Sequence, residues 1–193
     1  MKVAISIPNL LSLLRMGLVP LFVIFITRDD AGRALAVFAA AGLTDALDGF
    51  IARFWHQQTL LGAYLDPAAD KLLLTTAYVT LSIGAINPAL TIPLWVTILV
   101  IARDVLIITT VISLNLALGV KSFRPAGLSK VTTGLQVVTV VLVLAFLVWP
   151  QVPFLDEVAI VLIYAVAVFT VASGLNYIVF TNRMVAEHRE GSS

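Results

Sequence analysis

Long apolar runs alternate with short polar or proline-containing breaks along the chain. The runs cover residues 7–27, 32–54, 60–84, 91–118, 128–149 and 154–181. At 1.5 Å per residue, a helix over any of them would be long enough to cross a hydrocarbon layer of about 30 Å. Because backbone polar groups must be paired inside lipid, helices are expected rather than strands. The pattern therefore predicts an all-α, polytopic membrane protein with six transmembrane helices.

The composition supports this prediction. Hydrophobic residues make up 60% of the 193-residue chain and charged residues only 12%, about half the charged fraction of a soluble domain. We expect a single transmembrane domain over residues 1–193. The chain has no cysteine, which excludes a disulfide framework and a thiolate metal site. It has no basic stripe with interleaved aromatic residues, so a nucleic-acid partner is not expected.

The N-terminal run is interpreted as the first span rather than a removed signal peptide, because it continues to Thr27 with Arg15 inside it and no cleavage motif follows. The basic residues then set the orientation, since cytoplasmic loops are enriched in Lys and Arg. With a cytoplasmic N-terminus, the basic residues on or near that side are Lys2, Arg53, Lys121, Arg124, Lys130, Arg183 and Arg189. Only Arg28 and Arg33 would lie outside, so a cytoplasmic N-terminus is predicted.

Four aspartates lie inside this apolar pattern. Asp45 and Asp48 come near the end of the second run, and Asp66 and Asp70 near the start of the third. Each would cost roughly 2.5–3.5 kcal/mol at the centre of a membrane helix, so a compensating partner is expected. The spacings i,i+3 and i,i+4 place each pair on one helix face. Both pairs lie about 8–15 Å from the cytoplasmic side, which predicts a polar cavity open to that side.

Carboxylates that converge in this way need cations. Hard oxygen ligands favour Mg²⁺ or Mn²⁺, and two such ions form a clamp for displacement at phosphorus. The small residues Gly49, Ala52 and Gly62 would let a bulky ligand approach the helix backbone. Arg53 would add a fixed cation near a phosphate.

The segment Asp45-x₂-Asp48-Gly49-x₂-Ala52-Arg53-x₈-Gly62-x₃-Asp66-x₃-Asp70 resembles the signature of the CDP-alcohol phosphotransferase family at all eight positions. The resemblance implies that two divalent cations, Mg²⁺ or Mn²⁺, are bound by Asp45, Asp48, Asp66 and Asp70. It implies that Asp70 is also the general base. It assigns the binding of the CDP group to Asp48, Gly49, Ala52, Arg53 and Gly62. The acceptor oxygen would attack the β-phosphorus of CDP-diacylglycerol, and CMP would leave.

Two further segments resemble the phosphatidylglycerophosphate synthase and cardiolipin synthase branch of the family: residues 7–15 and Ala102-Arg103-Asp104. Glycerol 3-phosphate is the first expectation for the acceptor, with Arg103 and Lys130 at its phosphate. Asp104 is expected to point elsewhere on the helix, so that it does not neutralise Arg103. Phosphatidylglycerol is the alternative acceptor, because Asp104 and Ser129 resemble eukaryotic-type cardiolipin synthases. Inositol phosphate and other acceptors stay open.

The resemblance also implies a homodimer in a bacterial inner membrane, with the active site on the cytoplasmic side. Two rival functions remain: a divalent-cation transporter, since acids inside a membrane also mark ion paths, and an assembly subunit with structural metal sites. Structural roles remain open for single residues. Arg53 and Lys130 would be interfacial cations, and Gly49 and Gly62 packing positions. Arg103 would pair with an acid on another span, and Arg15 would close the helix bundle.

Overall fold

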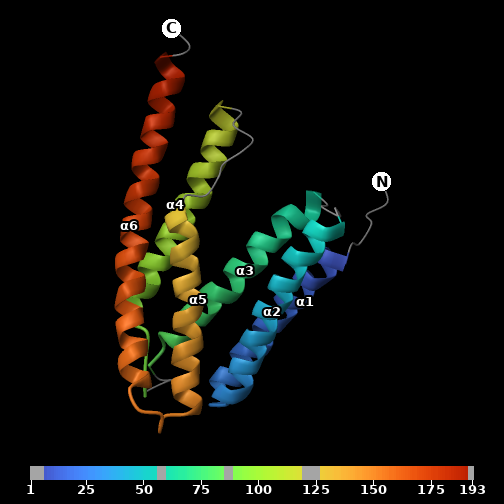
Figure 1. The fold of residues 1–193 in the computed structure, drawn as a ribbon, viewed down its shortest axis with the longest axis vertical. Coiled ribbons are helices and arrows are strands. Elements are labelled where there is room, and N and C mark those ends of the chain that lie inside the picture. Colours follow the sequence, from blue (N-terminus) through green and yellow to red (C-terminus); the bar gives the residue numbers. More distant parts are fainter. Residues whose placement is uncertain (1–6, 56–59, 85–88, 119–126, 191–193) are drawn as a thin grey trace. The chain divides into compact units, whose positions relative to one another are not determined.

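The computed structural model describes residues 7–55, 60–84, 89–118 and 127–190. Side chains are described in these ranges except at 7–9, 46–55, 60–68, 70, 112, 114–118, 180 and 182–190. The described chain is helical throughout apart from its turns (Figure 1). Its helices are α1 (Ile7–Thr27), α2 (Ala31–Trp55), α3 (Leu60–Leu81), α4 (Leu94–Leu118), α5 (Gly127–Val148) and α6 (Leu155–Glu190).

The predicted all-α class is confirmed, and each predicted span corresponds to one helix. The largest difference is at α6, which continues to Glu190, nine residues past the predicted end. Hydropathy marks where a span ends, but residues such as Met, Ala, Glu and Arg continue a helix in water. The start of α4 also moves, from residue 91 to Leu94, because Pro93 disfavours helical geometry in the residue before it.

Four of the helices are long and apolar enough to cross a membrane in the part of the chain that is described. These stretches are Leu10–Thr27, Leu94–Val111, Gly127–Val148 and Leu155–Val179. The protein is therefore an integral membrane protein. The helices α2 and α3 contain the four aspartates, and among the described side chains of α3 the shorter stretch Lys71–Leu81 is apolar. Six spans and a polar cavity stay predictions, because composition alone does not assign α2 and α3 to the membrane.

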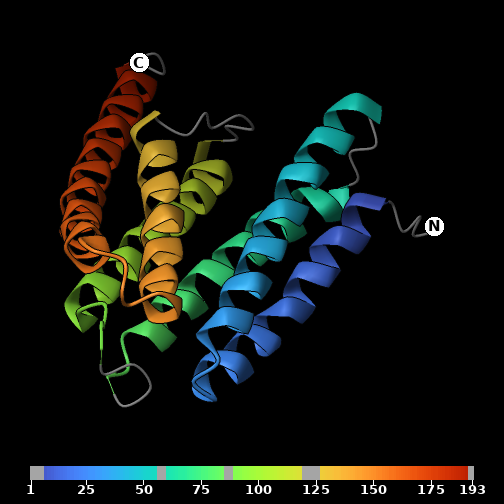
Figure 2. The ribbon, with the colours of Figure 1, turned by 60° about the horizontal axis from the view of Figure 1, so that its bottom comes forward.

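The helices fall into two compact units. Unit 1 comprises Met1–Ile92 and Val140–Ala159, and unit 2 comprises Pro93–Thr139 and Ile160–Ser193. In unit 1, α1 contacts both α2 and α3. Figure 2 shows α1 and α2 side by side and antiparallel. The prediction of a single domain over the whole chain is a separate matter and stays a prediction.

The turn between α1 and α2 sets their antiparallel arrangement. Asp29 has a φ of 60°, a left-handed conformation that aspartate tolerates better than most residues. The Asp30 amide donates to the Phe25 carbonyl at 3.0 Å, as in the usual end of a helix. The Asp30 carboxylate in turn accepts a hydrogen bond from the Arg33 amide at 3.0 Å and so caps the start of α2.

The contact between α1 and α2 has a regular register. The buried side of α1 is formed by Ser12, Arg15, Val19, Phe22 and Ile26, which follow each other at helical spacings of three and four. On α2 the buried residues Ala34, Phe38 and Ala41 have the same spacing. The rings of Phe22 and Phe38 meet with centroids 6.0 Å apart. One position in the buried side of α1 is therefore a charged residue, Arg15.

In unit 2, polar side chains link α4, α5 and α6. The Thr132 hydroxyl on α5 donates to the Phe169 carbonyl on α6 at 3.4 Å. Trp95 on α4 and Tyr164 on α6 have ring centroids 6.2 Å apart. Arg103 on α4 donates hydrogen bonds to α5 and to α6. Unit 2 thus has a polar connection among three helices that are otherwise largely apolar.

Candidate active site

The eight-residue motif lies where two consecutive helices approach a common break in the chain. Asp45 and Asp48 lie in the second half of α2, and Asp66 and Asp70 in the first half of α3. The predicted helical setting of the four acids is therefore confirmed. Their predicted convergence lies outside the described residues, because Asp45 is the one acid of the motif whose side chain is described.

For the other predicted site residues of the motif, the structure describes the backbone alone. Their backbone belongs to α2 or α3, and their side chains lie outside the described residues: Asp48, Gly49, Ala52, Arg53, Gly62, Asp66 and Asp70. Among the side chains that are described, no group of three or more potential metal ligands is found. Three of the four predicted ligands, Asp48, Asp66 and Asp70, lie outside these side chains.

Asp45 forms an ion pair with Arg15 of α1. The Nη2 atom of Arg15 lies 3.1 Å from Oδ1 of Asp45. The two partners differ strongly in exposure: the Arg15 side chain is 1% exposed and the Asp45 side chain 50%. The guanidinium therefore reaches the carboxylate from the packed side, and part of Asp45 remains accessible.

The register of the two helices explains this pair. Arg15 lies seven residues before Phe22 on α1, and Asp45 lies seven residues after Phe38 on α2. Seven residues are close to two helical turns. In an antiparallel pair, the contact that brings the two phenylalanine rings together therefore also brings Arg15 opposite Asp45. The ion pair is a continuation of the apolar contact between α1 and α2.

Asp45 fits a divalent cation in its chemistry. It is a hard oxygen ligand, and its side chain is half exposed. Its described ion pair is with the guanidinium of Arg15. A carboxylate has two oxygens and about four acceptor positions, so one contact with Arg15 leaves room for a metal ion on the accessible side. The described part of the motif is thus compatible with the cation site that the sequence predicts.

Arg103 has a different environment in unit 2. Its Nη1 atom donates to Oδ1 of Asp104 at 2.8 Å, and its Nη2 atom donates to Ser129 Oγ at 2.7 Å and to Ser173 Oγ at 2.8 Å. The prediction that Asp104 points elsewhere is therefore wrong. The Arg103 side chain is long enough to fold back beside its neighbour, and burial favours that contact because an unpaired charge in the core is costly.

Lys130 is exposed and directly follows Ser129 on α5. Arg103 and Lys130 therefore belong to the same unit and are connected through Ser129, but one is buried and the other faces outward. Ser129 is the third residue of α5, so Arg103 lies level with the start of that helix. Both α4 and α6 continue beyond this level (Figure 1).

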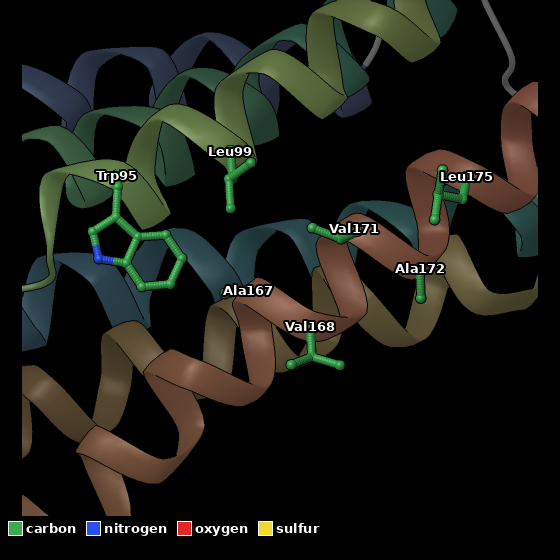
Figure 3. A pocket seen from close by; sticks show the side chains of 7 residues that line it. All are labelled: Trp95, Leu99, Ala167, Val168, Val171, Ala172 and Leu175. Carbon is green, nitrogen blue, oxygen red and sulfur yellow. The ribbon is translucent and has the colours of Figure 1, made fainter.

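Two adjoining cavities lie between α4 and α6 in unit 2. The larger, of about 480 Å³, is an apolar groove lined by Trp95, Leu99, Ala167, Val168, Val171, Ala172 and Leu175 (Figure 3). The smaller, of about 220 Å³, has Arg103 in its wall and shares Leu99, Val171 and Leu175 with the groove. The shared residues make the two cavities neighbours, and Arg103 contributes a cation to the wall of the smaller one.

Sequence reasoning missed two residues that contact predicted site residues. Arg15 was assigned only to closing the bundle, although its place among Ser12, Val19 and Phe22 marks it as a charge on the buried side of α1. Ser173 had no assignment. It is a buried serine within the membrane-length apolar stretch Leu155–Val179 of α6, and a buried hydroxyl there is a signal for a hydrogen-bond partner.

Comparison with known proteins identifies similar sequences. The sequence model of the CDP-alcohol phosphatidyltransferase family matches residues 5–175. A human cardiolipin synthase (CMP-forming) is 37% identical over 184 residues, covering 87% of this chain and 58% of the human protein. The chain thus spans less than two thirds of that relative.

Bacterial proteins are similar too. The CDP-diacylglycerol--glycerol-3-phosphate 3-phosphatidyltransferase of Shigella flexneri serotype 5b is 36% identical over 178 residues, covering 90% of this chain and 93% of that protein. A cardiolipin synthase (CMP-forming) of Streptomyces coelicolor is 40% identical over 113 residues, or 55% of this chain and 50% of the relative.

Proposed function

The chain belongs to the CDP-alcohol phosphatidyltransferase family, and we propose that it transfers a phosphatidyl group from CDP-diacylglycerol to an alcohol and releases CMP. The observation that carries the proposal is the complete eight-residue motif on α2 and α3, inside the matched residues 5–175. The ion pair between Arg15 and Asp45 supports it, because the first acid of the motif contacts a buried cation and is still half exposed.

In the proposed mechanism, Asp45, Asp48, Asp66 and Asp70 hold two divalent cations, Mg²⁺ or Mn²⁺. These ions supply neutralisation of the pyrophosphate and of the charge that develops during transfer. The remaining parts of the motif, with Gly49, Ala52, Arg53 and Gly62, bind the CDP group together with Asp48.

Asp70 accepts the proton of the acceptor hydroxyl. The acceptor oxygen forms a bond to the β-phosphorus, and the bond from that phosphorus to the oxygen of CMP breaks. The leaving group is CMP, and the proton on Asp70 passes to solvent. The acyl chains of the donor stay in the bilayer throughout.

Glycerol 3-phosphate is our first proposal for the acceptor. The support is that the chain covers 93% of a relative named for that acceptor, against 58% of the human cardiolipin synthase. Arg103 and Lys130 are the proposed phosphate ligands. The exposed Lys130 would meet the acceptor first, and Arg103 would lie behind it in the core of unit 2.

Phosphatidylglycerol is the second candidate, and a specific observation favours it. Arg103 already has a negative partner in Asp104 at 2.8 Å. The positive charge that remains suits a singly charged phosphodiester better than a dianion. The cavity beside Arg103 continues into the apolar groove of α4 and α6. An acyl chain would fit in that groove with its phosphate near Arg103, whereas glycerol 3-phosphate has no group for it.

One experiment tests the reaction and the acceptor together. The purified protein is supplied with Mn²⁺, CDP-diacylglycerol and either glycerol 3-phosphate or phosphatidylglycerol, and both CMP and the lipid product are measured. CMP release with a phosphatidylglycerophosphate product would support the first proposal, and a cardiolipin product the second. No CMP with either acceptor, or with inositol phosphate, would contradict the proposed reaction.

Asp70→Asn tests the general base. We expect it to lower the rate of CMP release by about 10²–10⁴-fold, the usual contribution of a positioned acid or base, without loss of the folded protein. Asp156→Asn, an exposed acid at the start of α6, is the matched control and should retain full activity. Wild-type turnover in Asp70→Asn would remove the assignment.

We further propose that α2 and α3 also span the membrane, that the N-terminus and active site are cytoplasmic in a bacterial inner membrane, and that the protein is a homodimer. The bias of basic residues supports the orientation. Because the natural chain has no cysteine, Lys130→Cys and Asp156→Cys can be labelled singly with an impermeant maleimide. Labelling of Lys130→Cys from the periplasmic side of intact cells would contradict the orientation, and crosslinking in membranes tests the dimer.

A further inference from the structure

We propose that Arg15 is a positioning residue for Asp45. Its guanidinium holds one carboxylate oxygen from the packed side and so directs the accessible side of the carboxylate toward a divalent cation. The inference rests on the proposed function, since it takes Asp45 as a ligand of that cation. It adds a residue of α1, a helix outside the eight-residue motif, to the machinery of the site.

The two partners of the ion pair differ strongly in exposure. Arg15 is 1% exposed, whereas Asp45 is 50% exposed, and the contact between Nη2 and Oδ1 is 3.1 Å long. The contact joins one guanidinium nitrogen to one carboxylate oxygen, so the charge of Arg15 attracts that oxygen toward the packed side. Since a carboxylate accepts about four hydrogen bonds or metal contacts, the contact with Arg15 leaves acceptor positions on the accessible side.

Arg15 also lies on the buried side of α1, where a charged residue is unusual. It occupies one place in a series of buried residues on α1 that otherwise contains Ser12, Val19, Phe22 and Ile26. An apolar residue there would pack against α2 without the cost of a buried charge, and buried ion pairs often stabilise a fold less than apolar substitutes do. A buried arginine in this place is therefore not explained by stability alone, and its partner Asp45 stays half exposed and accessible to a ligand.

Other contacts between α1 and α2 hold Arg15 in place. The ring contact between Phe22 and Phe38 lies two turns away in the same register, and the cap formed by Asp30 fixes the start of α2. These contacts hold the two helix backbones, so Arg15 cannot easily move away when a cation arrives. Orientation of Asp45 is then the main effect of Arg15, and it outweighs competition between guanidinium and metal for the same carboxylate.

If Arg15 orients Asp45, substitution of Arg15 weakens the binding of the divalent cation. Partners that orient a metal ligand typically change metal affinity by about 10–100-fold when they are substituted. Arg15→Met is therefore expected to bind Mn²⁺ roughly 10–100-fold more weakly. Arg15→Lys keeps the charge but not the planar fork, so its Mn²⁺ affinity should fall between those of the wild type and Arg15→Met.

The experiment measures Mn²⁺ binding to the full chain in detergent, without nucleotide or lipid substrate, from the free Mn²⁺ signal in electron paramagnetic resonance. The melting temperature without metal is recorded for every variant. Arg33→Gln is the matched control, because Arg33 also forms an ion pair with an aspartate next to α2, at 3.4 Å from Asp30, but is exposed and distant from the motif. It should bind Mn²⁺ as the wild type does.

A second readout separates positioning from loss of folded protein. The Mn²⁺ concentration that gives half-maximal CMP release should rise for Arg15→Lys, while the rate at saturating Mn²⁺ recovers most of the wild-type value. If Arg15→Met does not fold, Arg15→Lys decides the question by itself.

Unchanged or tighter Mn²⁺ binding by the folded Arg15 variants, beside normal binding by the wild type, would overturn this inference and leave the proposed function intact. Absence of Mn²⁺ binding by the wild type would instead overturn the metal premise of the proposed function, and the role of Arg15 with it.

Discussion

Two arginines are buried in the described part of the chain, and their partners differ. Arg15 reaches across from α1 to Asp45 of α2, an acid of the motif that remains half exposed. Arg103 binds its own neighbour Asp104 and two serines, Ser129 and Ser173, from the other helices of unit 2. A buried charge costs several kcal/mol unless it is paired. Arg15 and Arg103 are both paired, but with partners of different kinds.

The difference teaches how to distinguish a functional cation from a structural one. At Arg103 the negative partner is adjacent in sequence and mostly buried, and both hydroxyls point at the guanidinium. Such a residue mainly ties helices together, and any role at the acceptor phosphate adds to that. At Arg15 the negative partner is half exposed, which agrees with the proposal that Arg15 orients Asp45 for a divalent cation.

The strongest test of this comparison is Asp45→Asn. We expect CMP release to fall by more than about 100-fold, beyond the usual range for residues that act through a ligand, because the substitution removes a proposed cation ligand itself. The control is Asp30→Asn, since asparagine caps a helix about as well as aspartate. Near-normal CMP release by Asp45→Asn would mean that the Arg15 pair is only structural.

The next largest effect is expected for Arg103→Gln. Breaking a buried ion pair by removing one partner typically destabilises by about 3–5 kcal/mol, so the free energy of unfolding in a denaturing detergent titration should fall by that order. The Mn²⁺ affinity should not change, in contrast to the Arg15 variants, and the KM for the acceptor should rise. A loss of Mn²⁺ affinity in folded Arg103→Gln would remove the distinction between the two arginines.

The smallest effects are expected for Ser173→Ala and Ser129→Ala. A hydrogen bond to a charged group contributes about 1.5–3 kcal/mol, and each variant leaves Nη2 of Arg103 with one of its two hydroxyl partners. Because they share that partner, the two losses should not add in the double variant. Ser129→Ala should also raise the KM for the acceptor, since Lys130 follows it, whereas Ser173→Ala should not. If the KM for the acceptor were the same in Ser129→Ala and Ser173→Ala, Lys130 would act independently of Arg103 and its two serine partners.

Much of the fold could be predicted from the sequence. The six helical segments follow from the length and spacing of the apolar runs, and the motif on α2 and α3 follows from its spacing. The helix ends were less accurate, as the extension of α6 to Glu190 shows. The reason is that hydropathy reports the membrane, while a helix ends where backbone hydrogen bonds are no longer propagated.

The candidate site was only partly predictable. The aspartates of the motif were recognisable because acids are rare in such apolar surroundings. The environment of Arg103 was predicted incorrectly, since helix geometry alone places residues i and i+1 about 100° apart and takes no account of a long side chain folding back under burial. The partner of Arg15 was not predicted, although the charge itself was visible in the first apolar run.

The sequence by itself determined the class of protein, the order and approximate bounds of its helices, and the family to which it belongs. These properties depend on local spacing and on the identity of residues close together in the chain. The tertiary structure decided which side chains meet: Arg15 with Asp45, 30 residues apart, and Arg103 with Ser173, 70 residues apart. Such pairs depend on the register and rotation of packed helices, which result from the sum of many apolar contacts and are not encoded at any single position.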